Sequence, residues 1–175
     1  GMSAHLDGAR LWNAAVATGA SEARLAASST TVMVSFSKGL GAPVGAALAG
    51  SEEAMADGWQ VRKRLGGGMR QSGILAAAAL HGLEHHWPRM HEDHARAREL
   101  AHAVDGVGGA RVVSPDTNIV MIDLPPELPA TTLVGRCAKD GVRISMWNAS
   151  RVRAVTHLDV DKAAVARAGE VIARA

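Results

Sequence analysis

A short β-like run over residues 32–36 ends just before a lysine, Lys38, and a glycine-rich turn leads from it into a second apolar run over residues 44–49. Valine and phenylalanine favour strands, whereas Gly39 and Gly41 allow backbone angles that other residues avoid. The pattern predicts two strands around a glycine turn. It places the primary amine of Lys38 at the end of the first strand.

An amine presented in this way can form a Schiff base with an aldehyde. Enzymes that use pyridoxal 5'-phosphate do this opposite an aspartate that holds the pyridinium nitrogen. Asp7 offers such a carboxylate, because residues 5–7 read as the tail of an earlier strand and Arg10 follows three positions on. Taken alone, Lys38 also fits an ordinary surface lysine, and Asp7-Gly8 also fits a common turn.

Charge and composition narrow the class of protein. The chain has 175 residues and a formal net charge of only +2, with acidic and basic residues interspersed, so nothing indicates a nucleic-acid or anionic-membrane partner. No apolar run approaches the roughly 20 residues that a membrane span needs. The single cysteine, Cys137, excludes an internal disulfide and reads as a buried structural thiol. We therefore expect a cytoplasmic protein.

The order of helix and strand signals predicts two domains. Residues 1–86 alternate strands with helices over 9–18 and 51–64, and Ser51 can cap the second helix. A helical segment over about 71–104, interrupted at Pro88, joins them to a smaller α+β domain over residues 87–175. In that domain we expect strands over 110–113, 118–124, 142–146 and 152–156, and helices over 131–139 and 161–175.

Two other motifs invite different functions. Gly39, Gly41 and Gly45 form a pattern one residue longer than the dinucleotide-binding fingerprint, but a β-like run follows where that fingerprint needs a helix. His81 and His85, with Glu84 between them, match the H-x-x-E-H pattern of inverted zinc proteases. The histidine-rich stretch around them reads better as a solvated helix face, so we predict no metal site.

Basic residues supply two further candidate sites. Lys63, Arg64 and Arg70 surround a triple glycine, where they could clamp a phosphate or simply compensate a helix dipole. Arg153 lies inside the run 152–156, where its guanidinium could bind a ligand carboxylate or point outward into solvent.

Taken in order, these motifs resemble one known family. The strings His-Leu-Asp-Gly-Ala-Arg, Ser-Phe-Ser-Lys-Gly-Leu-Gly-Ala-Pro-Val-Gly, Gly-Gly-Gly-Met-Arg-Gln-Ser-Gly and Arg-Ala-Val-Thr-His-Leu-Asp-Val are similar to those of the low-specificity L-threonine aldolases. These are fold type I pyridoxal phosphate enzymes. The resemblance implies an α/β fold, the C-terminal part of the aspartate-aminotransferase-like fold. It would comprise an incomplete cofactor-binding large domain and a small α+β domain.

The resemblance also implies roles for individual residues. Lys38 would form the Schiff base with pyridoxal 5'-phosphate, and Asp7 would pair with its ring nitrogen. Arg10 would lie near the cofactor and, with Arg153, would take the substrate carboxylate. Lys63 and Arg70 would lie near the cofactor phosphate, reaching across a subunit boundary.

The implied reaction is cleavage of L-threonine or L-allo-threonine to glycine and acetaldehyde, a carbon–carbon lyase reaction on a small amino acid. The match begins in the middle of the family's pattern, so we expect a truncated chain with exposed apolar surface that assembles into a homo-oligomer, a dimer or tetramer. We further expect little or no activity. A non-catalytic remnant of a threonine aldolase is the alternative.

Overall fold

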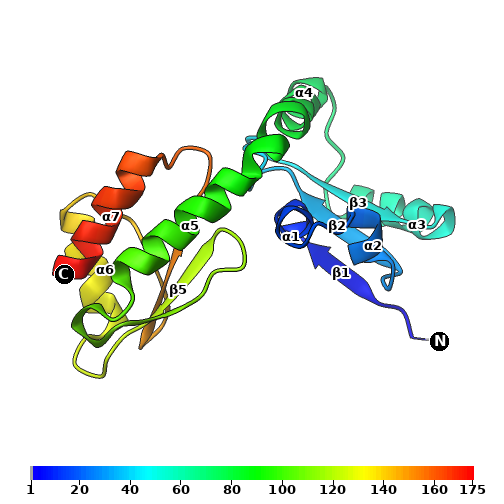
Figure 1. The fold of residues 1–175 in the computed structure, drawn as a ribbon. Helices are drawn as coiled ribbons and strands as arrows, with labels where there is room; N and C mark the ends of the chain where they lie inside the picture. The colour runs from blue at the N-terminus through cyan, green and yellow to red at the C-terminus, as the bar shows by residue number, and fades with distance from the viewer. Residues whose placement is uncertain (1) are drawn as a thin grey trace. The chain divides into compact units, whose positions relative to one another are not determined.

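The computed structural model describes residues 2–175, which form two compact units divided between Met90 and His91 (Figure 1). The division lies within the helical segment expected over residues 71–104. Each unit has its own β-sheet.

The first unit has a three-stranded sheet in the order β1-β2-β3. Strand β1 (His5–Gly8) is parallel to β2 (Thr31–Ser35), and β3 (Ala46–Gly50) is antiparallel to β2. The two runs around the glycine turn are therefore strands, as the sequence predicted, and the structure shows that they pair with each other. Because β1 and β2 are parallel, a crossover connection must join them, and such a connection is usually helical.

That crossover contains α1 (Leu11–Thr18) and α2 (Glu22–Ala26). Helix α1 ends at Gly19, whose left-handed φ of 69° suits glycine. The short α2 was not expected from the sequence. Its signal is the side chain of Ser21, which accepts a hydrogen bond from the amide of Arg24 at 3.3 Å and caps the helix.

Helix α3 (Glu52–Arg64) begins where the sequence predicts. The hydroxyl of Ser51 accepts a hydrogen bond from the amide of Ala54 at 3.2 Å, while Glu52 and Glu53 lie in the positive first turn. The helix runs back along β3. Ala46 and Leu48 of the strand and residues from both ends of the helix line the space between the two elements.

The helical segment that follows changes its type of winding three times. Helix α4 (Gly73–His81) continues into a π-helical turn, η1 (Gly82–His86), then a 3₁₀ turn, η2 (Trp87–Arg89), and finally α5 (Met90–Val104). Pro88 lies in the 3₁₀ turn, so the interruption expected at this proline is confirmed. Among residues 2–175, no helix combines the length and apolar character needed to cross a membrane.

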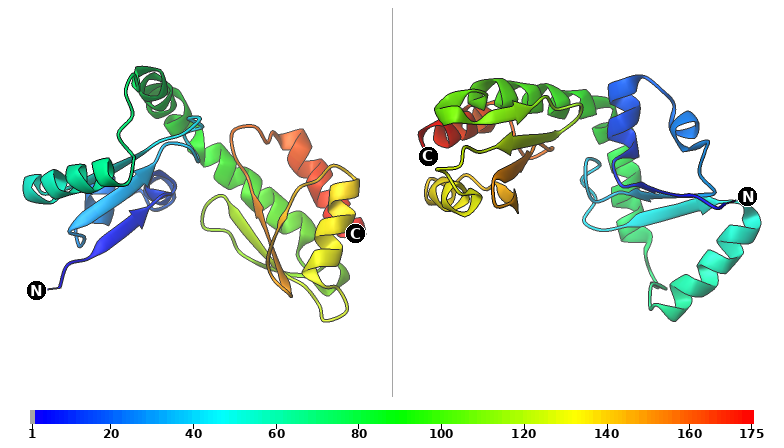
Figure 2. Two further views of the ribbon diagram at one scale, coloured as in Figure 1. Left: turned by 180° about the vertical axis from the view of Figure 1, so that it is seen from behind. Right: turned by 90° about the horizontal axis from the view of Figure 1, so that it is seen from below.

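The second unit is a sheet covered by helices (Figure 2). Its strands lie in the order β4-β5-β7-β6, all antiparallel, with β4 (Arg111–Val113), β5 (Ile119–Asp123), β6 (Ser145–Asn148) and β7 (Arg151–Val155). Paired residues Val120 and Ala154, and Ile122 and Val152, are buried together. They pack in one cluster with α5, α6 (Ala130–Lys139) and α7 (Lys162–Arg174), so these helices share one face of the sheet.

One strand differs from its predicted position. The run 142–146 was expected to be a strand, but β6 begins only at Ser145. Gly141 has a φ of 76°, and the amide of Val142 donates to the carbonyl of Cys137 at 2.9 Å, closing the C-terminus of α6. Helix capping therefore uses the backbone that a longer strand would need. Cys137 itself is fully buried, as the sequence predicted.

The two units bury apolar side chains to different extents. The large hydrophobic cluster lies wholly in the second unit. In the first unit α3 has no buried residue and α4 buries only Ala79. Leu65 and Ile74 are 81% and 84% exposed, which confirms the expected exposed apolar surface.

This surface predicts self-association through the first unit. Replacing Leu65 and Ile74 together by Asp should lower the mass of the assembly measured by size-exclusion chromatography with light scattering, because the change removes apolar area that association would bury. Val113→Asp, the same change at an exposed apolar residue of the second unit, is the matched control. A wild-type chain that is monomeric at every concentration would contradict the prediction.

Candidate active site

Asp7 and Lys38 lie at the same edge of the first sheet. Asp7 is the next-to-last residue of β1 and pairs with Met33 of β2, and Lys38 follows shortly after β2 ends at Ser35. Parallel strands end at a common edge, where α/β proteins place their ligand sites. The fold therefore brings together the two groups that the sequence singled out.

The Asp7 carboxylate is exposed and held at the strand end. Its Oδ1 accepts a hydrogen bond from the amide of Ala9 at 3.1 Å. Gly8, which follows it, is buried so closely against β2 that an added Cβ would lie 2.7 Å from the carbonyl oxygen of Met33. Glycine at this position allows β1 to approach β2.

Backbone hydrogen bonds hold the loop that carries Lys38. The Lys38 carbonyl accepts from the amide of Gly41 at 2.9 Å, closing a tight turn, and Gly41 has a φ of 70°. The Phe36 carbonyl accepts from the Ala42 amide at 3.0 Å. The Lys38 side chain is exposed and makes no hydrogen bond or ion pair with any residue of the range 2–175. Its amine is thus available to a ligand.

Arg10 lies in the short connection between β1 and α1, at this same edge. It is the N-cap residue of α1, and its side chain is half-buried. Trp12 lies two residues after Arg10, and the centre of its ring is 5.8 Å from the centre of the Phe36 ring. Phe36 is the first residue of the lysine loop. This contact ties the start of α1 to the loop.

Sequence reasoning missed two polar residues beneath the loop. Asn13 of α1 is only 2% exposed, and a Cβ on Gly39 would lie 3.3 Å from its Oδ1. His86 donates a hydrogen bond from Nδ1 to the carbonyl oxygen of Leu40 at 2.7 Å. The available signal for Asn13 was a polar residue between apolar positions of a helix, since Leu11 and Ala15 are also buried.

Lys63 and Arg70 are exposed side chains at the end of α3 and in the glycine loop after it. The Lys63 amine lies 5.9 Å from the centre of the Trp59 ring. The loop is fixed by Arg62, whose Nε donates to the carbonyl of Gly67 at 2.9 Å. Within residues 2–175, no hydrogen bond or ion pair joins Lys63 or Arg70 to the lysine loop.

Arg153 belongs to the second unit and lies on the face of β7 opposite the hydrophobic core. Its Nε is buried without a hydrogen-bond partner, and its guanidinium carbon lies 5.6 Å from the centre of the Trp147 ring. Arg151, two residues earlier on β7, instead forms an ion pair with Asp123, in which Nη2 donates a hydrogen bond to Oδ2 at 2.9 Å. Arg153 Nε is therefore a buried donor for which no residue of the range 2–175 supplies a partner.

The alternative motifs acquire structural explanations. The glycine turn after Lys38 leads into strand β3, so it does not begin a helix whose N-terminus could receive a pyrophosphate. His81 and His85 have ring centres 4.4 Å apart on α4 and the π-helical turn. Across residues 2–175, no group of three or more His, Cys, Asp or Glu residues is arranged to hold a metal ion.

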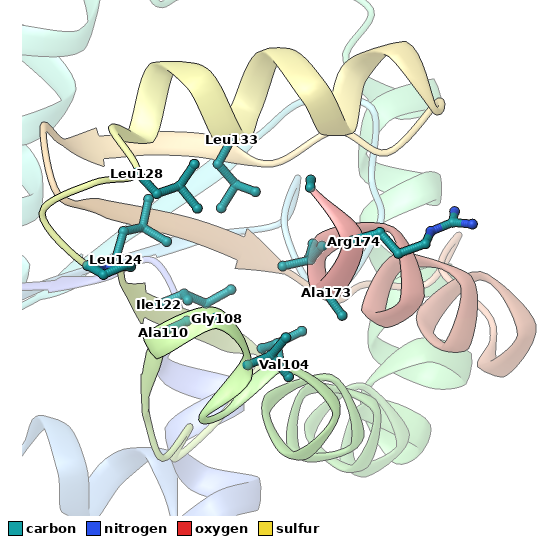
Figure 3. Close-up of a pocket in the computed structure, with 13 residues that line it drawn as sticks. Val104, Gly108, Ala110, Ile122, Leu124, Leu128, Leu133, Ala173 and Arg174 are labelled. Carbon is teal, nitrogen blue, oxygen red and sulfur yellow. The ribbon is translucent and has the colours of Figure 1, made fainter.

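A cavity of about 100 Å³ lies inside the second unit (Figure 3). Leu124, Leu128 and Leu133 point into it, whereas the guanidinium of Arg174 points away. Its lining is almost entirely apolar and offers no catalytic group. We therefore assign the candidate active site to the Asp7–Lys38 edge.

The groups at this edge fit pyridoxal 5'-phosphate at two points. A free primary amine at Lys38 suits the cofactor's aldehyde, and an exposed carboxylate at Asp7 suits its protonated ring nitrogen. Glycines at positions 39 and 41 keep side-chain bulk away from the turn that carries the amine.

Solved structures share the fold of this chain. The chain matches a threonine aldolase of Leishmania major with a TM-score of 0.78 at 19% identity, covering 99% of this chain and 52% of that one. It matches an alpha-aminoadipate aminotransferase of Thermus thermophilus with a TM-score of 0.63 at 21% identity, covering 87% and 43%. The fold is that of the C-terminal half of fold type I pyridoxal phosphate enzymes.

Sequence relatives identify the family. The beta-eliminating lyase model matches residues 1–126, so the chain belongs to the beta-eliminating lyase family. Low-specificity L-threonine aldolase 1 of Arabidopsis thaliana is 40% identical over 161 residues, which are 90% of this chain and 45% of that protein. The low specificity L-threonine aldolase of Escherichia coli strain K12 is 40% identical over 162 residues, 92% and 47%. The chain thus spans about half the length of these relatives.

The Asp123–Arg151 pair predicts an acid-sensitive contribution to the stability of the second unit. The hydrogen bond from Arg151 holds the pKa of the Asp123 carboxyl below its usual value. The pair therefore stabilises the fold above the usual aspartate pKa, and this contribution is lost as the pH falls through the lowered one. Arg151→Gln should reduce the fall in the free energy of unfolding between neutral and acidic pH, measured by urea denaturation.

Arg153→Gln is the matched control, because Arg153 lies on the same strand without a carboxylate partner among residues 2–175. An Arg151→Gln chain whose stability depends on pH as strongly as the wild type would refute this assignment.

Proposed function

We propose that this chain is part of a pyridoxal phosphate-dependent aldolase that cleaves L-threonine or L-allo-threonine to glycine and acetaldehyde. The observation that carries the proposal is the placement of Lys38 and Asp7 at one sheet edge. The proposed reaction and substrate come from the relatives, which are named low-specificity L-threonine aldolases and are 40% identical over about nine-tenths of this chain.

Pyridoxal phosphate supplies an electron sink for bond cleavage beside the amino group of an amino acid. Lys38 is the residue whose amine would bond to the cofactor's aldehyde. Asp7 would hold a proton on the ring nitrogen, because a carboxylate there favours the charged form of the ring. Lys63 and Arg70 would bind the phosphate as exposed cations.

Arg10 and Arg153 are the proposed binding groups for the substrate carboxylate. A guanidinium can hold a carboxylate through two parallel hydrogen bonds, which fixes the orientation of the amino acid. The unpartnered Nε of Arg153 supports this role, since a buried donor without a partner costs free energy that a bound carboxylate would recover.

The chain contains only part of the length of its relatives, so we propose that its residues form only part of a working site. Activity would then need further groups, from a second copy or another polypeptide, in a homo-oligomeric assembly. A single buried cysteine, Cys137, is consistent with a reducing, cytoplasmic compartment.

A non-catalytic remnant is the second candidate. The observation that favours it is the thin core of the first unit, where α3 buries no side chain. A unit with so little buried apolar area has a small margin of stability with which to hold a cofactor.

The cofactor assignment predicts covalent labelling of one lysine. Incubation with pyridoxal phosphate, reduction with borohydride and peptide mass spectrometry should place a pyridoxyl group on Lys38. Lys38→Ala should abolish that labelled peptide and the visible absorbance band of the bound cofactor. Lys139→Ala, a change at another exposed lysine, is the control and should retain both. Labelling spread evenly over all lysines would contradict the assignment.

The proposed reaction predicts how much acetaldehyde the chain releases from L-threonine. We expect the chain alone to release little acetaldehyde from L-threonine, because it supplies only part of the site. Any acetaldehyde that forms should disappear in Lys38→Ala, as measured with an aldehyde-coupled dehydrogenase. Labelling of Lys38 without aldolase activity fits an incomplete site, whereas absence of both supports the remnant.

A further inference from the structure

The loop that carries Lys38 packs against the π-helical turn η1. No strand residue of the range 2–175 takes part in this contact. Leu40, two residues after Lys38, is only 1% exposed. Its backbone faces two residues of the turn, Gly82 and His86. A π-helical turn is rare, and such turns occur frequently at functional sites.

His86 makes the polar part of this contact. Its Nδ1 lies 2.7 Å from the carbonyl oxygen of Leu40. A carbonyl oxygen can only accept, so Nδ1 carries the hydrogen and donates it. The bond is partly buried, where competition from water is reduced. It therefore fixes a backbone atom of the turn that presents the lysine amine.

Two glycines allow the loop to come this close. A Cβ on Gly82 would lie 2.4 Å from the Leu40 carbonyl oxygen and 3.0 Å from the Leu40 Cβ. A Cβ on Gly39 would lie 2.7 Å from the Cε of Met90. Neither glycine has a positive φ, so close packing rather than backbone freedom explains both. The obstacle at Gly82 is the Leu40 backbone, whereas at Gly39 it is the movable end of the Met90 side chain.

We propose that His86 is a positioning residue for Lys38: its hydrogen bond to Leu40 holds the Lys38–Gly41 turn in the conformation that directs the amine toward the Asp7 edge. A lysine side chain has four rotatable bonds, so its amine is only as well placed as the backbone that carries it. The role of Lys38 in binding the cofactor rests on the proposed function, whereas the ordering of the turn by His86 does not.

The test compares two substitutions of His86. His86→Asn keeps an N–H donor at nearly the position of Nδ1, whereas His86→Leu keeps similar bulk without a donor. His85→Leu is the matched control, because His85 lies on the same π-helical turn and also packs against the His81 ring, but among residues 2–175 it makes no hydrogen bond to the lysine loop. Urea denaturation of every variant separates a local effect from a general loss of stability.

The first measurement follows the stability of the Lys38–Gly41 turn in the absence of any cofactor. Hydrogen exchange at the Gly41 and Ala42 amides, which close the turn, should be faster in His86→Leu by about two- to tenfold, the range that the net contribution of one hydrogen bond allows. His86→Asn should restore protection to within about twofold of the wild type. His85→Leu should change neither amide.

The second measurement follows borohydride-trapped labelling of Lys38 by pyridoxal phosphate, with Lys139 of the same chain as internal reference. Labelling of Lys38 should be slower in His86→Leu and restored in His86→Asn. Unchanged exchange in His86→Leu, or equal loss in both variants, overturns the positioning role. Normal exchange effects with no labelling of Lys38 in the wild type would instead refute the proposed cofactor site while leaving the contact intact.

Discussion

The parallel pairing of β1 with β2 is the constraint on which the candidate site depends. It places the end of β1, with Asp7, beside the end of β2, from which the Lys38 loop begins. An antiparallel pairing would put the two groups at opposite edges of the sheet. Gly8 makes the close pairing possible at that end, and α1 provides both the crossover and the buried Asn13 beneath the loop.

The two units rely on different sources of stability. The second has a sheet with one face covered by three helices and a continuous apolar cluster, so it has a core of its own. The first holds its functional loop mainly by backbone hydrogen bonds and close glycine contacts, while α3 and α4 leave apolar side chains in water. The unit that carries the candidate chemistry is thus the one whose fold would gain most from a further surface packed against it.

The histidine-rich segment shows how one pattern can serve different physical purposes. Its spacing resembles a metal-binding motif, yet in the fold His86 contacts a backbone carbonyl and His81 and His85 contact each other's rings. A side chain with two nitrogen atoms can be a ligand, a base or a hydrogen-bond donor, and its partner decides which. Sequence spacing places such residues on one helix face without identifying that partner.

The sequence by itself determined most of the local structure and pointed to Lys38 and Asp7 as candidate site residues. Alternating apolar residues, caps such as Ser51 and breaks such as Pro88 act within a few residues, so the strands around Lys38, helix α3 and the division of the helical segment could be predicted. The order of the motifs also indicated the family. Only the tertiary structure decided the parallel register that puts Asp7 and Lys38 at the same edge of the sheet, the face of β7 that carries Arg153, and the contact of His86 with Leu40. Each of these depends on residues far apart in the chain, whose proximity follows from packing rather than from local preference.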